Sequence, residues 1–202
     1  VYQWCLDTAP VPQPAFALSS AIALGSFILG RTYVAQPSTE LNLYIIDIGE
    51  SSSGKEHPRT VLKQIAKQGD WSQLITEDVF SGSAVFTAMA DSNKRLYLLD
   101  EFGLVMQRGC VQQNTNQQQL IRALLSIYTS SHTSVRGADY ADKKVSTKTL
   151  WRPSLTLLGS TTPQTFYSAL TSEDVSNGFL PRFLVFFVPG RKMPQGKMLS
   201  PI

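Results

Sequence analysis

The sequence is poor in the residues that mark disulfide-rich and metal-binding proteins. Its 202 residues include two cysteines and two histidines. Cys5 and Cys110 lie far apart, which fits neither a disulfide framework nor the paired spacing of a zinc site and indicates reduced thiols in a cytosolic protein. His57 has no second histidine at ligand spacing, so we expect it to have a structural role or to support a neighbouring ligand rather than to bind a metal.

Long apolar runs are also scarce. The longest, residues 15–30, falls short of the roughly 20 residues that a transmembrane helix needs. It contains three serines, and it lacks the basic flank and the small-residue cleavage site of a signal peptide. This run therefore predicts a buried helix, and we expect no contact with a membrane.

Charge is modest as well. Charged residues make up 16% of the sequence and the net charge is +3, which is too mild to indicate nucleic-acid binding without local clusters. The apolar content of 43% is sufficient for one continuous core. Because the chain begins with Val1 and its last residues end no obvious element, we expect it to be a piece of a longer protein.

What the sequence does contain is an alternation of apolar runs and amphipathic segments. Residues 1–40 combine a proline-rich stretch, which favours an extended lead-in, with the apolar helix, and we expect them to pack as a helical lead-in on a core of residues 41–202. In that core, β-rich runs alternate with helical ones, which predicts an α/β three-layer sandwich with a mainly parallel central sheet. Strands are expected within residues 41–48, 95–101, 153–163 and 183–188, and helices at 58–69, 82–91, 119–128 and 163–170.

The segment GESSSGKEHPR, residues 49–59, lies between a predicted buried strand and a predicted helix. Strand, glycine-rich loop and helix in this order indicate a phosphate-binding loop, in which main-chain amides and the helix N-terminus converge on phosphate oxygens. Lys55 would then reach the β- and γ-phosphates of a nucleotide, and a Gly/Ser surface turn is the alternative. The expected nucleotide-binding residues are Gly49, Glu50, Ser51, Ser52, Ser53, Gly54, Lys55 and Glu56.

Glu56 departs from the usual form of such a loop. A Ser or Thr hydroxyl in this position ordinarily binds magnesium, whereas a carboxylate adds negative charge close to the triphosphate. Either Glu56 points away from the nucleotide, or the magnesium ion is held differently.

The segment RLYLLDE, residues 95–101, predicts a buried strand that ends in two carboxylates. Such a strand carries Asp100 to the carboxyl edge of the sheet, where nucleotides bind in open α/β folds. There we expect Asp100 to hold magnesium through water and Glu101 to polarise the attacking water. The alternative is a strand that runs into an acidic turn.

Two further segments supply polar residues. The strand within residues 157–163 ends in hydroxyls that can sense a γ-phosphate, while Thr162 followed by Pro163 is also typical of a helix N-cap, and both roles stay open. Arg182, just before an apolar strand, is a candidate arginine finger for its own subunit or a neighbour, with a surface arginine as the alternative.

The segments GESSSGKEHPR, RLYLLDEFG, LLGSTTPQTFY and NGFLPRFLVF follow one another in this order. Together they resemble a family of phage- and mobile-element-borne P-loop ATPases, helicase-like proteins that are often fused to a primase-polymerase module. An acidic residue after the loop lysine is a usual variant in this family, so the resemblance makes Glu56 a family trait.

This resemblance implies a RecA-like or AAA-like core that binds ATP and Mg²⁺ and hydrolyses ATP. It also implies a homo-oligomeric ring, such as a hexamer, that moves along single-stranded or replication-fork DNA in the cytoplasm of a bacterial or phage-infected cell. The roles it assigns are those of phosphate lysine (Lys55), metal ligand (Asp100), water-activating carboxylate (Glu101), sensor (Thr161) and finger (Arg182).

The leading hypothesis is therefore the motor domain of an ATP-dependent DNA helicase or translocase. An ATP-binding assembly module with weak or no hydrolysis, or a packaging-type ATPase, is the alternative. DNA contact is expected from basic side chains with Tyr140 for base stacking, although a solvated loop has the same composition. The expected DNA-binding residues are Arg136, Lys143, Lys144 and Lys148, and the reserves for the catalytic carboxylate are Glu77 and Asp78.

Overall fold

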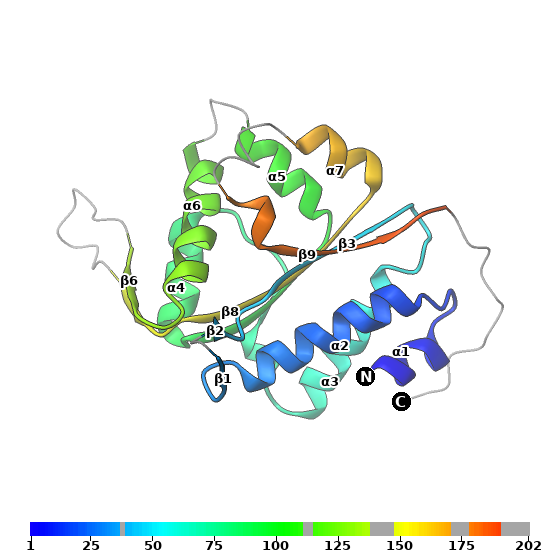
Figure 1. Ribbon diagram of the computed structural model, residues 1–202, viewed down its shortest axis with the longest axis horizontal. Coiled ribbons are helices and arrows are strands. Elements are labelled where there is room, and N and C mark those ends of the chain that lie inside the picture. The colour runs from blue at the N-terminus through cyan, green and yellow to red at the C-terminus, as the bar shows by residue number, and fades with distance from the viewer. Residues whose placement is uncertain (37–38, 111–114, 138–147, 171–177, 191–202) are drawn as a thin grey trace.

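A five-stranded parallel sheet runs through the middle of the molecule (Figure 1). The computed structural model describes residues 1–36, 39–110, 115–137, 148–170 and 178–190. The sheet confirms the predicted α/β fold, because parallel strands require crossover connections such as helices. Its strands are β3 (Tyr44–Gly49), β4 (Ile75–Thr76), β5 (Lys94–Leu99), β8 (Ser154–Thr161) and β9 (Phe183–Val188), in the order β4-β5-β8-β3-β9.

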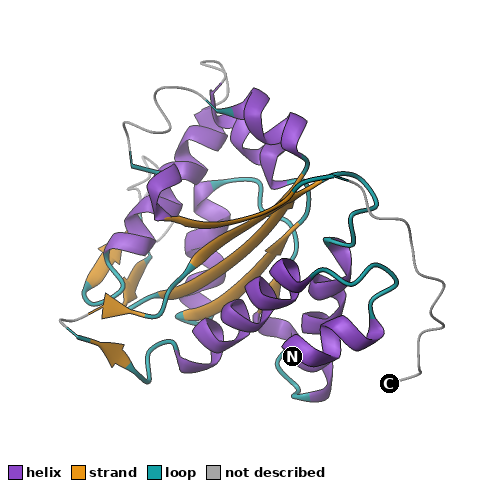
Figure 2. Ribbon diagram, turned by 45° about the vertical axis from the view of Figure 1, so that its right-hand side comes forward, coloured by secondary structure: helices purple, strands orange, loops and turns teal. Residues whose placement is uncertain are grey.

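Helices cover both faces of this sheet (Figure 2). Successive side chains of a strand point to opposite faces, and β3 shows this directly: Tyr44 and Ile46 belong to one apolar cluster and Ile45 to another. The first cluster is covered by α4 (Gly82–Asp91), α5 (Phe102–Cys110), α6 (Thr115–Thr129) and α7 (Pro163–Ala169). The opposite face is covered by α2 (Pro14–Leu29) and α3 (Glu56–Gln68), with α1 (Tyr2–Thr8) packed on them.

Two small antiparallel pairs lie outside the central sheet. The pair of β6 (Ser134–Arg136) and β7 (Thr149–Trp151) lies just before β8 in the chain, at the amino end of that strand. The pair of β1 (Val34–Ala35) and β2 (Thr39–Glu40) follows α2. Short 3₁₀ turns, η1 (Ser72–Leu74) and η2 (Leu180–Arg182), precede β4 and β9.

The apolar run of residues 15–30 forms α2, and its predicted burial is confirmed. Phe16, Ala23 and Phe27 are buried against the sheet and α3. Among the described residues, no helix combines the length and apolar character that a bilayer span needs.

Two boundaries differ from the prediction. The lead-in is not extended from its start, because Tyr2–Thr8 forms α1 and the prolines of residues 10–14 only follow it. Similarly, α6 begins at Thr115, in a polar, glutamine-rich stretch that precedes the predicted helix start at residue 119. Glutamine has a good helix propensity, so this polar composition does not prevent a helical turn.

Candidate functional site

The loop of residues 50–55 connects the carboxyl end of β3 to the first turn of α3. Gly54 has a φ of +88°, and a Cβ there would lie 2.5 Å from the Val11 carbonyl oxygen. A Cβ on Gly49 would meet the Ser53 hydroxyl at 2.6 Å and the Phe16 ring at 2.8 Å. Both glycines are therefore required by the local backbone and packing, and the loop leads from β3 into the N-terminus of a helix, a position that favours anions.

Lys55 is buried at the base of this loop, with only 5% of its surface exposed. Its Nζ donates to the carbonyl oxygens of Gly49 at 3.3 Å and Glu50 at 3.5 Å. Within the described part of the chain, no carboxylate lies within ion-pair distance of this ammonium group. A buried charge without a counterion is unfavourable, so the arrangement favours the binding of an anion.

The N-terminal segment covers the loop from one side. Val11 and Phe16 contact Gly54 and Gly49 as described above, and Thr8 Oγ1 lies 2.9 Å from His57 Nε2 at the start of α3. This bond fits the structural role expected for His57, whose pKa is lowered by burial. The lead-in thus forms a wall of the candidate site.

Asp47 is a buried carboxyl on β3, two residues before the loop. One of its oxygens accepts a hydrogen bond from Ser19 Oγ at 2.8 Å, while the other has no partner. Burial raises the pKa of Asp47 well above its ordinary value, despite the opposing effect of the Ser19 bond. The neutral acid is therefore favoured, and Asp47 is a poor counterion for Lys55.

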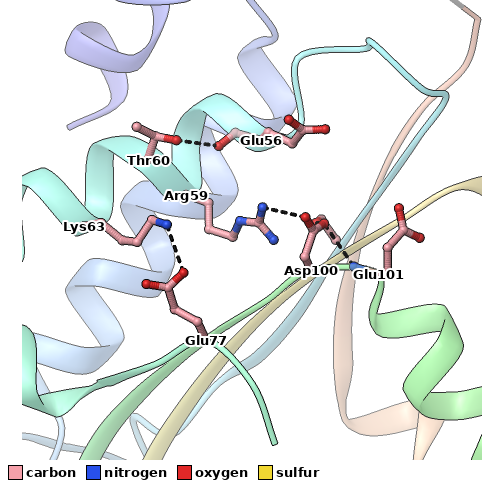
Figure 3. A network of polar contacts seen from close by, with 8 residues as sticks. Glu56, Arg59, Thr60, Lys63, Glu77, Asp100 and Glu101 are labelled. Atoms are coloured by element: carbon pink, nitrogen blue, oxygen red, sulfur yellow. Dashed lines mark hydrogen bonds and ion pairs between the residues drawn. The ribbon is translucent and has the colours of Figure 1, made fainter.

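Asp100 lies directly after β5 and connects three elements (Figure 3). It accepts hydrogen bonds from Arg59 of α3 at 2.8 Å, from Ser160 of β8 at 3.0 Å and from the Glu101 amide at 3.0 Å. Burial by itself raises the pKa of Asp100, but the hydrogen bond and positive charge of Arg59 and two further hydrogen bonds outweigh it, so that the pKa lies below its ordinary value. Asp100 is therefore held ionised beside the first turn of α3.

The four candidate carboxylates meet around one small pocket at the carboxyl ends of β4 and β5. The pocket has a volume of about 120 Å³. Glu101 is exposed there with a left-handed φ of +45°, and Lys63 of α3 pairs with Glu77 at 2.9 Å. Glu77 and Asp78, the alternative candidates for the catalytic carboxylate, thus lie in the same pocket as Asp100 and Glu101. The pocket is lined by Glu77, Asp78, Val79, Phe80, Leu99, Asp100, Glu101, Leu104 and Val105.

The donor set does not fit the Mg²⁺ that was expected at Asp100. Both oxygens of Asp100 already accept hydrogen bonds, one of them from a guanidinium. Glu56 is exposed, and the contact drawn at it in Figure 3 is the hydrogen bond that its main-chain carbonyl accepts from Thr60 at 3.3 Å, apart from the contacts of Asp100. Among the described residues, no group of three or more His, Cys, Asp or Glu is placed to hold a metal. A cationic side chain, Arg59, stands where a cation was expected.

The polar end of β8 reaches the site through Ser160 rather than Thr161. The Thr161 hydroxyl is buried, donates to the Thr162 carbonyl at 3.4 Å and packs where a Cβ on Gly103 would lie, at 2.4 Å. Ser160, by contrast, donates to Asp100. The structure therefore does not place Thr161 as a sensor. Thr162 caps α7 by accepting from the Thr165 amide, which confirms the N-cap prediction.

Arg182 lies at the amino end of β9, whereas the loop follows the carboxyl end of the neighbouring strand β3. It precedes β9, whose first residue pairs with Tyr44 and whose last pairs with Gly49. Six residues of strand separate Arg182 from the loop by about 20 Å. Its guanidinium donates to the Gly178 carbonyl and lies over the Tyr128 ring. A finger acting on the loop of its own subunit is therefore wrong, while a role in a neighbour's site stays a prediction.

The expected DNA-binding residues are only partly described. Arg136 and Lys148 lie on the β6–β7 pair or directly beside it, at the amino end of β8 and therefore far from the loop. Lys143, Lys144 and Tyr140 lie outside the described residues.

Sequence reasoning missed Arg59 as a site residue. It lies four residues after Lys55, on the same face of the first turns of α3, which is the one local signal that points to it. Its partner Asp100 follows strand β5, 41 residues further along the chain, so no local sequence pattern indicates the ion pair.

Comparisons with protein-family models and with curated proteins found no match for this chain. Its function is therefore argued from the geometry of the loop and the carboxylates.

Proposed function

We propose that this chain is a P-loop ATPase domain that binds ATP at residues 49–56 and serves as the motor of a helicase-like DNA translocase. The observation that carries the proposal is Lys55, a buried ammonium held by loop carbonyls without a carboxylate partner in the described residues. A triphosphate supplies the missing negative charge, and the loop amides with the N-terminus of α3 bind its oxygens.

The carboxylates support hydrolysis rather than binding alone. Glu101 is exposed at the pocket and can orient and polarise a water for attack on the γ-phosphate. Asp100 pairs at 2.8 Å with Arg59, in the first turn of the helix that follows the loop, where a guanidinium can neutralise charge on the transferring group. Ser160 fixes Asp100 from the intervening strand β8.

Assembly into a ring is supported by the edge strand β9. Three of its apolar side chains, Leu184, Val185 and Phe187, are exposed, and an exposed apolar edge strand favours contact with another chain. A neighbouring subunit would also give Arg182 a site on which to act as a finger. A hexamer on single-stranded or fork DNA is the assembly that we propose.

The motor proposal is tested by ATP turnover with and without single-stranded DNA. Wild-type protein should hydrolyse ATP faster when DNA is added, and Lys55→Ala should abolish turnover because the γ-phosphate loses its cation. Lys63→Ala is the matched control, since it removes an exposed lysine from the same helix. Turnover in Lys55→Ala equal to that of the wild type would contradict the proposal.

A second candidate is an ATP-gated assembly module that barely hydrolyses ATP. It is favoured by the Arg59–Asp100 ion pair, which occupies the expected metal ligand, and by Glu56 in place of a hydroxyl. In this case oligomer size, measured by light scattering, should follow ATP occupancy while turnover stays near background. Glu56→Thr should then raise magnesium-dependent turnover.

A further inference from the structure

The outward face of the β6–β7 pair lies at the end of the molecule opposite the loop (Figure 1). Directly opposed residues of an antiparallel pair share a face, so Trp151 lies beside Ser134, and Thr149 beside Arg136. Leu150 is buried in the core on the other side. Alternation along β7 therefore directs Trp151 outward, on the same face as Arg136, which is its diagonal neighbour across the pair.

Two large aromatic side chains are exposed at this end of the molecule. The Trp151 side chain is 66% exposed, and Tyr33, in the turn after α2, is 60% exposed. Exposed rings of this size offer flat apolar faces on which nucleobases stack.

Arg31 brings positive charge to the main chain of Trp151. Its exposed guanidinium donates through Nη1 to the main-chain carbonyls of Trp151 and Arg152, both at 3.0 Å. Arg152 itself is neutralised by Glu40, at 3.0 Å. Lys148 does not belong to this face, because alternation along the strand places it on the side of Leu150.

We propose that this face, which we call the Trp151 face (Arg31, Tyr33, Arg136 and Trp151), binds single-stranded nucleic acid. A base stacks on the Trp151 indole while the two arginines contact the flanking phosphates. Splayed bases are available in single strands but not in a duplex, so the single strand is the ligand that fits.

The inference rests on the proposed function in that a translocating motor needs a strand-binding surface. It places that surface on the edge of the sheet opposite Lys55, and the chain connects the two sites directly. β8 begins three residues after Trp151 and ends beside Asp100 through Ser160. Because the two sites lie at opposite ends of β8 and share no side chain, nucleic-acid binding and ATP binding should be separable by mutation.

The test is fluorescence anisotropy with a labelled oligo-dT strand in the absence of nucleotide. Loss of one stacked base weakens binding by about 5- to 150-fold, so Trp151→Ala should do this, while Trp151→Phe, which keeps a ring, should retain most of the affinity. Arg136→Ala should weaken binding and reduce the salt slope by about one. Lys63→Ala, which removes a lysine of α3 that pairs with Glu77, should bind like the wild type.

Several results would overturn the proposal. These are undetectable oligonucleotide binding by the wild type at low salt, equal affinity of wild type and Trp151→Ala, and a change of oligomer size in Trp151→Ala with unchanged DNA affinity, which would make the face a contact between copies. If oligo-U binds with the same affinity as oligo-dT, the face recognises the phosphates and bases that RNA and DNA share, which supports the proposal. Lys55→Ala separates the two proposals, because it should lose ATP binding and keep oligo-dT binding.

Discussion

Asp47 and Lys55 are both buried near the same loop, yet they do not form an ion pair. Asp47 bonds to Ser19, and burial favours its neutral form. Lys55 therefore has only main-chain partners among the residues that the structure describes, and its ammonium group can attract an anion that enters the loop.

The raised pKa of Asp47 makes stability depend on pH. The stability that this group contributes is fully present below its unfolded pKa, about 4, and is lost as the pH rises through its folded pKa. Asp47→Asn keeps an acceptor for Ser19 without a charge, so its melting temperature should exceed that of the wild type by an amount that grows from pH 5 to pH 9. Parallel melting profiles over this range would contradict a buried acid.

Arg59→Ala should have the opposite pH dependence. Asp100 has a lowered pKa, so the pair stabilises the fold above about pH 4 and this contribution is lost as the pH falls further. Because the pair is partly exposed, we expect up to about 1 kcal/mol, or about 2–4 °C in melting temperature at pH 7. The deficit should shrink below pH 4, and Lys63→Ala should cause a smaller one. A deficit that is constant with pH would exclude the ion pair as its cause.

Much of the site was visible in the sequence at this level. Lys55 and Asp100 are predicted by motifs that combine a few neighbouring residues, whereas Arg59 and Ser160 act through partners on other elements. The placement of Thr161 was wrong because one residue of register along a strand reverses the face on which a side chain lies.

Among the elements, α1, the connection that contains Val11 and the start of α2 form a wall against the loop of residues 50–55. The close approach of Val11 to Gly54 shows that this wall and the loop fit without space for a side chain. The lead-in is therefore part of the candidate site rather than an appendage.

Gly54→Ala tests this fit. A left-handed alanine costs about 1–2 kcal/mol, and its Cβ would also displace Val11, so we expect lower stability together with weakened ATP binding. Gly25→Ala is the matched control: it lies within α2, its Cβ would meet nothing within 4 Å, and alanine there should stabilise the helix by about 0.5–1 kcal/mol. Denaturant unfolding measures both changes. Equal effects of the two substitutions would contradict the proposed fit.

The order of the longer strands and of most helices followed from periodicity, which is strongest in buried strands such as β3 and β8. The two-residue strand β4 and the helices α1 and α5 were not predicted. Element ends were less predictable. The prolines suggested an extended start to the chain, but α1 forms there. It can do so because it ends before the first proline, so no proline lies inside the helix.

In the whole molecule, the candidate nucleotide site and the Trp151 face lie at opposite edges of one sheet. The sequence predicted the parallel sheet, but not that β8 lies between the loop strand β3 and the carboxylate strand β5. Strand order depends on tertiary packing, which residue patterns along the chain do not record. This order makes β8 the physical connection between the two edges.

The sharpest test of a nucleotide site at this loop is an equilibrium titration of ATP by calorimetry at pH 7, with wild type, Lys55→Ala and Lys63→Ala compared. Wild type and Lys63→Ala should bind one ATP per chain with similar affinity, and Lys55→Ala should show at least a tenfold loss while remaining folded by circular dichroism. Equal ATP affinity in Lys55→Ala and the wild type, or no binding by the wild type, would contradict a phosphate-binding loop at residues 49–56.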